Sequence, residues 1–232
     1  MFLRRLGAMV FAVALTSSIL GGISPAKAVD EFNNATYSID SPDSIWVVVN
    51  KKRPLNPKTY IPADIVRPGS FNTGRYQLAR VASVAYIHMA RAMKAAGAGT
   101  LELHSGYRSY TTQKSVHAGA VAKWGRVAGE NLAARPGFSE HQTALAADVG
   151  VPAQGCRIRV CFGTTKGGKW LAKNAWKYGF IIRYPNGQTN ITGYQYEPWH
   201  IRYVGVDLAT EMHNRGVSVL ESFWELPSAK TY

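Results

Sequence analysis

The sequence predicts an α+β fold in which helices flank a small sheet. Short runs rich in β-branched and aromatic residues indicate strands, and longer segments with apolar residues at helical spacing indicate helices. The two kinds of segment alternate irregularly, which favours the α+β class. Residues 45–232 show no internal repeat, low-complexity tract or second domain. We therefore expect a single domain over residues 45–232.

The first 28 residues have the pattern of a signal peptide. Arg4 and Arg5 form a basic start, residues 6–20 are apolar and uncharged, and residues 26–28 (AKA) form a small-x-small cleavage site. An uncleaved membrane anchor is the alternative, because the apolar run approaches the minimum spanning length. The short run and the well-placed cleavage site favour cleavage after Ala28. We therefore expect a secreted protein.

Composition and charge limit the partners of the mature chain. Cleavage leaves 204 of the 232 residues and lowers the formal net charge from +13 to +10, because the leader carries three basic residues and no acid. A basic exported protein has nucleic acid, anionic lipid or an acidic wall polymer as candidate partners, with mere solubility as a further explanation. The export signal argues against nucleic acid. We expect an anionic cell wall as partner and no stable membrane span after cleavage.

Residues 29–97 are predicted to contain one strand and one long helix. Residues 29–44 are polar and mixed, so we expect a mobile arm there. Residues 45–50 (IWVVVN) indicate a strand, and the prolines of residues 51–69 indicate extended chain. A helix should follow from residue 72 or 73 to residue 97. Its predicted apolar stripe consists of Leu78, Val81, Ala85, Met89, Ala92 and Ala96.

The rest of the domain should supply the other strands and helices. The predicted strands are residues 101–105, 145–149, 180–184 and 200–204. The predicted helices are residues 111–124, 169–178, 206–214 and 217–223. Residues 131–138 should form a loop, and residues 151–165 an insertion that carries both cysteines.

The two cysteines are five positions apart in this insertion. Cys156 and Cys161 are the only cysteines of the chain. Outside the cytoplasm such a pair is expected to form a disulfide that closes a small hairpin or loop. A zinc knuckle is the competing explanation, but it needs further ligands nearby, and none is present.

Residues 139–148 (SEHQTALAAD) are the centre of the chain. The strand predicted at their end places Leu145, Ala147 and Val149 on one face and Asp148 on the other. A carboxylate on the face opposite a packed apolar face needs a partner, because burying an unpaired charge is costly. Asp148 is therefore a candidate functional residue.

A histidine in the same stretch supplies a possible partner for Asp148. On one helix His141 and Asp148 would lie about 10 Å apart, and on one straight strand they would lie further apart. The chain must therefore turn between them if they share a metal. A third ligand is needed, and His200, within residues 197–200 (EPWH), is the candidate. Each of these residues could instead have a structural role, because this spacing is loose compared with a contiguous metal motif.

Together the three side chains suit a hydrolytic zinc site. Nitrogen and oxygen donors in a set of three fit Zn²⁺ and leave a fourth position for water. Zinc lowers the pKa of such a water and polarises a carbonyl. Glu197 is the candidate base, because a bend at the following proline would bring it beside the site without making it a ligand.

Hydrolysis also needs a positive group near the reacting carbonyl or a substrate carboxylate. Arg108 lies in a predicted strand-to-helix turn, and its planar fork can pair with a carboxylate. Gln113 and Ser139 are candidates for neutral hydrogen bonds. Arg183 and Arg202 are expected to form structural ion pairs near the site.

Four segments in order resemble the VanY-type D-alanyl-D-alanine carboxypeptidases. They are residues 105–113 (SGYRSYTTQ), 135–148 (RPGFSEHQTALAAD), 179–185 (GFIIRYP) and 197–205 (EPWHIRYVG). This family is similar in its zinc-site fold to lysostaphin-type peptidases and the hedgehog domain. The resemblance implies an antiparallel sheet that holds one zinc ion per chain.

The resemblance also implies a role for each candidate residue. His141, Asp148 and His200 would be the zinc ligands, and Glu197 the general base. Arg108 would contact the substrate. Ser139 and Gln113 would line the end of the pocket that holds its carboxylate. The implied substrate is a peptidoglycan stem peptide, from which a C-terminal D-alanine is released.

Two departures from the family pattern bear on activity. Ala144 stands where the family has glycine, and alanine would strain the turn if the backbone there needs a positive φ. The cysteine insertion follows Asp148 closely and could form a stiff loop that alters substrate choice. The alternatives to a D,D-carboxypeptidase are an L,D-carboxypeptidase acting on tetrapeptides, an endopeptidase and a non-catalytic zinc-containing wall-binding module. Retention of Glu197 and Arg108 favours an enzyme.

Overall fold

The computed structural model describes residues 32–72 and 74–232. The expected signal peptide, residues 1–28, lies outside these residues. Within the part of the chain that is described, no helix combines the length and apolar character needed to cross a membrane.

A four-stranded antiparallel sheet forms the centre of the fold. Its strand order is β3 (Glu102–Ser105), β4 (Ala146–Gly150), β6 (His200–Tyr203) and β5 (Phe180–Ile182). A second, two-stranded sheet pairs β1 (Ile65–Val66) with β2 (Leu78–Ala79). The expected small antiparallel sheet is confirmed, with strands shorter than or shifted by a residue from those predicted.

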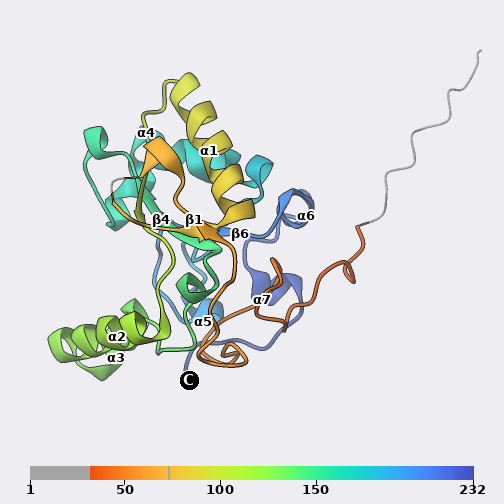
Figure 1. Cartoon of the computed structure of the whole chain (residues 1–232), viewed down its shortest axis with the longest axis vertical. Coiled ribbons are helices and arrows are strands. Elements are labelled where there is room, and N and C mark those ends of the chain that lie inside the picture. Colours follow the sequence, from red (N-terminus) through yellow and green to blue (C-terminus); the bar gives the residue numbers. More distant parts are fainter. Residues whose placement is uncertain (1–31, 73) are drawn as a thin grey trace, which may run out of the picture. The chain divides into compact units, whose positions relative to one another are not determined.

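Seven α-helices and five 3₁₀ helices are found among the described residues. The α-helices are α1 (Arg80–Ala95), α2 (Tyr110–Trp124), α3 (Arg126–Leu132), α4 (Lys166–Asn174), α5 (Thr189–Thr192), α6 (Val206–Asn214) and α7 (Leu220–Phe223). The 3₁₀ helices are η1 (Gly69–Phe71), η2 (Glu140–Thr143), η3 (Pro152–Gln154), η4 (Val160–Thr164) and η5 (Ala175–Tyr178). Figure 1 shows α1 and α4 on one side of the sheet and α2 and α3 as a pair beyond its other side. The α+β class is thus confirmed.

The alternation predicted for β4 is confirmed. Leu145, Ala147 and Val149 are buried in the main hydrophobic core together with Met89 of α1. Asp148 lies on the opposite face of the strand, where it faces the two histidines described below. The apolar face therefore holds the sheet against α1 and fixes the direction in which the carboxylate points.

Helix α1 differs from its prediction in both its start and its buried face. It begins at Arg80 rather than at residue 72 or 73, because Leu78 and Ala79 pair with β1 instead. The predicted stripe is partly wrong, since Val81 is 50% exposed. The side chains that α1 buries are those of Ala82, Ser83, Tyr86, Met89, Ala90 and Met93. Only Met89 belongs to both sets within the helix.

Residues 45–50 do not form the predicted strand. Two of their backbone carbonyls accept hydrogen bonds from a side chain rather than from a strand: Arg202 donates to Ile45 O at 3.0 Å and to Val47 O at 2.8 Å. Trp46 donates its indole N–H to Val204 O at 2.9 Å. Residues 46–49 are buried and Ile45 is half-buried, all without a neighbouring strand, so the hydrophobicity of the segment alone predicted the wrong structure.

The predicted disulfide is confirmed. Cys156 and Cys161 are bonded, with their Cα atoms 5.6 Å apart. The bond closes a short loop that follows η3 and ends within η4. Ile158, within this loop, lines the pocket described below.

Candidate metal and catalytic site

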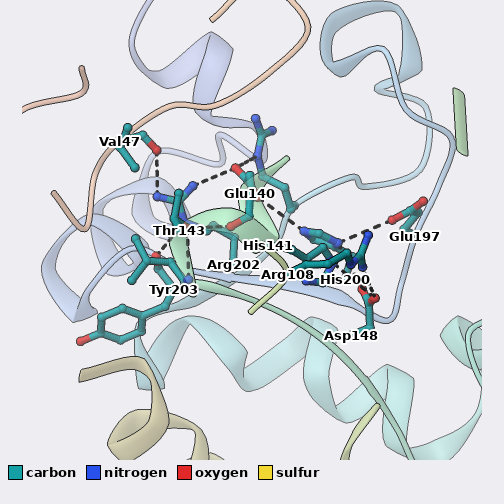
Figure 2. Close-up of polar contacts among 12 residues, drawn as sticks. Val47, Arg108, Glu140, His141, Thr143, Asp148, Glu197, His200, Arg202 and Tyr203 are labelled. Atoms are coloured by element: carbon teal, nitrogen blue, oxygen red, sulfur yellow. Dashed lines mark hydrogen bonds and ion pairs between the residues drawn. The ribbon is translucent and has the colours of Figure 1, made fainter. Parts of the chain in front are cut away.

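Three predicted ligands meet at one end of the main sheet. The ring nitrogens of His141 and His200 and a carboxylate oxygen of Asp148 lie within 4.8 Å of one another, and all three residues are buried. His141 Nε2 is 3.3 Å from Asp148 Oδ2, and His200 Nδ1 is 3.2 Å from Asp148 Oδ1. Figure 2 shows the three side chains directed toward one another.

Strand register brings two of these residues together. Asp148 of β4 lies directly opposite His200 of β6 in the antiparallel pair. Side chains at such opposed positions point to the same face of the sheet and lie within contact distance. His141 comes from η2, so the chain turns between it and β4, as the spacing of seven residues required.

A backbone carbonyl orients His141. The Gly106 carbonyl oxygen is 2.8 Å from His141 Nδ1, so that Nδ1–H donates there and the Nε2 lone pair faces Asp148. Gly106 can occupy this position because it lacks a side chain: a Cβ there would lie 2.3 Å from the Gln77 carbonyl oxygen. The glycine of residues 105–113 thus has a definite role in building the site.

The donor set fits a zinc ion. Zinc bonds of about 2.0–2.2 Å in a tetrahedron place neighbouring donor atoms about 3.3–3.6 Å apart, close to the two separations at Asp148. Asp148 Oδ1 is buried and has no well-aligned hydrogen-bond partner among the described residues. Two imidazoles and one carboxylate are also the ligand types that zinc takes in catalytic sites.

The charges of the site favour binding of a cation. Asp148 is buried, but His141 and His200 hold the pKa of its carboxyl well below the ordinary value. Burial would lower the pKa of His200, yet its contacts with Asp148 and Glu140 raise that pKa to about 9. A metal ion must displace this proton, so its binding should release protons.

Glu197 lies beside the three ligands without joining them. A turn at the next two residues separates it from β6, and its Oε2 is 3.7 Å from His200 Nδ1. Burial raises the pKa of Glu197 to about 8, although His200 and Arg108 act in the opposite direction. A carboxyl group with such a pKa can both hold and release a proton near neutral pH.

Arg108 is held over the same site by its neighbours. Its Nη1 donates to Gln113 Oε1 at 2.9 Å, its Nη2 donates to Ser105 Oγ at 3.1 Å, and Nη2 is 3.8 Å from Asp148 Oδ2. Gln113 also donates its amide N–H to Ala134 O at 2.7 Å. Both polar ends of the Gln113 side chain are therefore engaged, and its contact with Arg108 orients the guanidinium group.

The site residues open into one pocket of about 310 Å³. Its walls include all seven predicted site residues: Arg108, Gln113, Ser139, His141, Asp148, Glu197 and His200. Sequence reasoning missed two tyrosines in the wall, Tyr184 and Tyr194, whose rings lie 4.7 Å apart. The Tyr184 ring also lies 4.8 Å from the ring of His200. Tyr184 belongs to the family-like segment of residues 179–185 but was given no role, and Tyr194 lies outside all four segments.

Ala144, which stands where the family has glycine, adopts the left-handed backbone conformation that glycine favours. Its φ is 60° and its ψ is 12°, and it is fully buried. It ends η2 by donating its N–H to His141 O at 3.2 Å, and it precedes β4. A non-glycine residue in this conformation costs roughly 1 kcal/mol. The chain tolerates this strain at the turn between two ligands.

A second buried cluster of charges adjoins the ligands. Glu140 Oε1 accepts from Arg183 Nε at 2.7 Å and from Arg202 Nη1 at 2.8 Å. Arg183 also forms a two-point contact with Glu221, at 2.9 and 2.6 Å. Glu221 accepts from Asn50 at 2.9 Å as well. The expected structural ion pairs of Arg183 and Arg202 are thus present, while the importance of Glu140 was missed.

Sequence comparison places the chain among carboxypeptidases. The sequence profile of the VanY family, described as D-alanyl-D-alanine carboxypeptidase, matches residues 75–206. The Bacillus subtilis protein YodJ is 41% identical over 192 residues, which cover 80% of this chain and 69% of YodJ.

Solved structures of two carboxypeptidase types are similar to this one. The LdcB LD-carboxypeptidase is 39% identical with a TM-score of 0.74, and the match covers 81% of this chain and 88% of LdcB. A vancomycin-resistance D,D-pentapeptidase VanY in complex with Zn(II) is 28% identical with a TM-score of 0.65. That match covers 77% of this chain and 97% of the VanY chain.

Proposed function

Because the chain belongs to the VanY family of D-alanyl-D-alanine carboxypeptidases, we propose that it is a secreted zinc carboxypeptidase that releases the C-terminal D-alanine of peptidoglycan stem peptides. The observation that carries this proposal is the buried group of His141, Asp148 and His200. Glu197 and Arg108 lie beside it in one pocket. A metal-assisted hydrolase needs this combination of ligands, base and cation.

His141, Asp148 and His200 would hold one zinc ion per chain. When bound, zinc supplies a Lewis acid that polarises the scissile carbonyl and makes water acidic. Glu197 would accept the proton of the attacking water and return it to the leaving amine. Its raised pKa supports this exchange, because the carboxylate can both take up and release a proton near neutral pH.

Arg108 would bind the substrate's negative charge. Its guanidinium group lines the pocket, is oriented by Gln113 and is 18% exposed. A planar guanidinium forms paired hydrogen bonds with a carboxylate, such as the free C-terminus of a peptide. Gln113 would act mainly through Arg108, and Ser139 would line the end of the pocket that receives this carboxylate. A preference for a free C-terminus distinguishes a carboxypeptidase from an endopeptidase.

Two kinds of stem peptide are candidate substrates. The family description and the likeness to VanY favour a pentapeptide ending in D-Ala-D-Ala, which requires D,D-carboxypeptidase activity. The higher identity and TM-score with LdcB favour an L,D-carboxypeptidase acting on the tetrapeptide as the second candidate. The metal ligands and the carboxylate-binding arginine serve both reactions, so the chirality of the residue before the scissile bond must be tested with substrates.

An anionic cell wall is the proposed surrounding of this enzyme. No acidic residue occurs between Asp148 and Glu197, and the exposed lysines of α4 and η5 lie in this stretch. They are Lys166, Lys169, Lys173 and Lys177. Lys166, Lys169 and Lys173 are three and four residues apart on α4, so they share one helix face, which would attract polyanions; Lys177 follows on η5. Replacing all four lysines with glutamine should weaken binding of the protein to isolated cell walls at low salt and leave turnover of a soluble peptide unchanged. Unchanged wall binding would contradict a role of these lysines in holding the enzyme at the wall.

Substitution of Glu197 tests the assigned catalytic role. Glu197→Gln should lower turnover of a D-alanine-terminated stem peptide by about 10²–10⁴-fold, the usual contribution of a general base, and leave zinc content unchanged. Glu211→Gln is the matched control, because Glu211 lies on α6 and pairs only with Arg215 in the described contacts. Full turnover by the Glu197 variant would contradict the mechanism, and loss of zinc would identify Glu197 as a ligand instead.

A further inference from the structure

Glu140 is buried next to a metal ligand but belongs to the adjoining ionic cluster. Both arginines that contact it bind the same carboxylate oxygen, Oε1. The other oxygen, Oε2, is buried and has no hydrogen-bond partner of good geometry in the part of the chain that is described. It lies 3.5 Å from His200 Nε2, which is likewise buried and lacks such a partner.

The two nitrogens of His200 therefore face two different carboxylates. Nδ1 faces Asp148 at 3.2 Å, and Nε2 faces Glu140 at 3.5 Å. Figure 2 shows Glu140 on the side of the His200 ring away from Asp148. A carboxylate only accepts hydrogen bonds, so when a metal takes the place of the proton on Nδ1, Glu140 favours the tautomer that keeps its proton on Nε2. The lone pair of Nδ1 then faces the other donors of the metal site.

We infer that Glu140 is a positioning residue that orients His200 and selects Nδ1 as its metal-binding atom. This inference rests on the proposed zinc function of the site. Glu140 acts on His200 as the Gly106 carbonyl acts on His141, where Nδ1 is held and Nε2 faces the metal site. Each histidine thus has one anchored and one metal-facing nitrogen. Such outer contacts fix the tautomer and the orientation of the ring.

The anchors of Glu140 explain how it can hold a ring in place. Arg202 is fixed by the carbonyls of Ile45 and Val47, and Arg183 is fixed by Glu221. These partners come from the start of the domain, from β6, from the residue directly after β5 and from α7. Glu140 is consequently held by distant parts of the fold, and its distance from His200 depends on their packing.

Glu140 is not itself one of the ligands. Its free oxygen faces the ring atom opposite the metal-facing nitrogen, and it is not part of the group of donor atoms that lie within 4.8 Å of one another. Its substitution should therefore weaken zinc binding without removing a donor. Loss of an outer partner of this kind typically costs 10–100-fold in metal affinity.

The test compares zinc affinity, by competition with a chelator, in the full mature chain and its variants. Glu140→Gln alone leaves an excess of buried positive charge and could prevent folding. The double variant Glu140→Gln/Arg202→Met removes one anion and one cation, so that Arg183 and Glu221 remain paired. We expect zinc binding by the double variant to be 10–100-fold weaker than by the parent.

The control is Glu130→Gln, because Glu130 also contacts an arginine and lies 3.8 Å from His117 Nε2, away from the metal site. Its zinc affinity should stay within threefold of the parent.

A nuclear magnetic resonance signal separates orientation from a general loss of stability. In the zinc-loaded parent, the His200 Nε2–H proton should appear downfield because it is donated to a carboxylate, and it should move upfield in the double variant. Parent-like zinc affinity together with an unchanged Nε2–H signal would overturn the inference. If the parent binds zinc but cleaves no peptide, the proposed function fails, while the affinity order of the variants still decides the role of Glu140.

Discussion

Two clusters of buried charge lie side by side in this fold and are built differently. In the ionic cluster of Glu140, Arg183, Arg202 and Glu221, opposite charges meet at 2.6–2.9 Å. In the site cluster of His141, Asp148, His200, Glu197 and Arg108, the corresponding separations are 3.2–3.8 Å. All members of the two clusters are buried except Arg108, whose side chain is 18% exposed to the pocket.

The difference in charge separation indicates a different role for each cluster. The ionic cluster contains two cations and two anions at hydrogen-bonding distance, so its charges neutralise one another and fix the fold. The site cluster has donors spaced as they would be around a zinc ion, together with a carboxyl of raised pKa. Burial alone does not identify a functional site; the distances between the charges do.

The largest effect is expected from breaking the ionic cluster. Arg183→Met would leave Glu140 and Glu221 buried without their shared partner, and the free energy of unfolding should fall by about 3–5 kcal/mol. Urea denaturation measures this change. Arg215→Met is the matched control, because Arg215 pairs with Glu211 at the surface and its loss should cost less than about 1 kcal/mol. Equal effects at the two positions would contradict the assigned structural role.

Zinc should stabilise the fold through the site cluster alone. At a free concentration about 1,000 times Kd, a ligand that binds only the folded state adds about 4 kcal/mol to the free energy of unfolding. Asp148→Asn should abolish most of this gain, and the exposed histidine variant His88→Ala should retain it. Denaturation with zinc and with a chelator measures the difference. An identical response of the two variants would show that zinc binds elsewhere.

Acid should weaken the ionic cluster through Glu221. Burial would raise the pKa of Glu221, but Arg183 and Asn50 hold that pKa below its ordinary value. A carboxyl with a depressed pKa adds stability above its unfolded-state pKa of about 4.3, and this stability is lost as the pH falls through the folded-state value. Glu221→Gln should therefore flatten the dependence of unfolding free energy on pH below about 4.5. An unchanged slope would show that Glu221 does not contribute to it.

The smallest effect concerns the turn between the ligands. Ala144→Gly should relieve the positive φ and raise the free energy of unfolding by up to about 1 kcal/mol, because glycine adopts this conformation freely. Denaturation measures the gain, and Ala146→Gly, at the start of the fully buried β4, should instead destabilise the fold. A loss of stability in the Ala144 variant would show that packing of its methyl group outweighs the strain.

Local patterns in the sequence were enough to find much of the sheet and the site. The alternation around Asp148 predicted which face of β4 is apolar, and the spacing from His141 required the turn that η2 supplies. The disulfide between Cys156 and Cys161 was also predicted, from the spacing of the two cysteines and the expected export of the chain. Each of these inferences depends on neighbouring residues, so the sequence carries the information directly.

Contacts between distant residues account for what the sequence did not reveal. Arg202 donates hydrogen bonds to two carbonyls of residues 45–50, those of Ile45 and Val47. This hydrophobic segment therefore resembles a strand in sequence but pairs with a side chain instead of a strand. Glu140 lies in the family-like segment of residues 135–148, but the sequence assigned it no role, because its two arginine partners are brought to it only by the fold. Because Leu78 and Ala79 of β2 pair with β1, α1 likewise begins at a later residue than predicted. In all three cases the partner is far away along the chain or belongs to another element.

The most direct measurement is mass spectrometry of the products formed by the purified, zinc-loaded chain. One sample receives a stem pentapeptide ending in D-Ala-D-Ala, and another receives the matching tetrapeptide. The account predicts the loss of a single C-terminal alanine, from the pentapeptide for a D,D-carboxypeptidase or from the tetrapeptide for an L,D-carboxypeptidase. If the folded, zinc-bound protein leaves both peptides intact, the site cluster is not a carboxypeptidase centre and the account is contradicted.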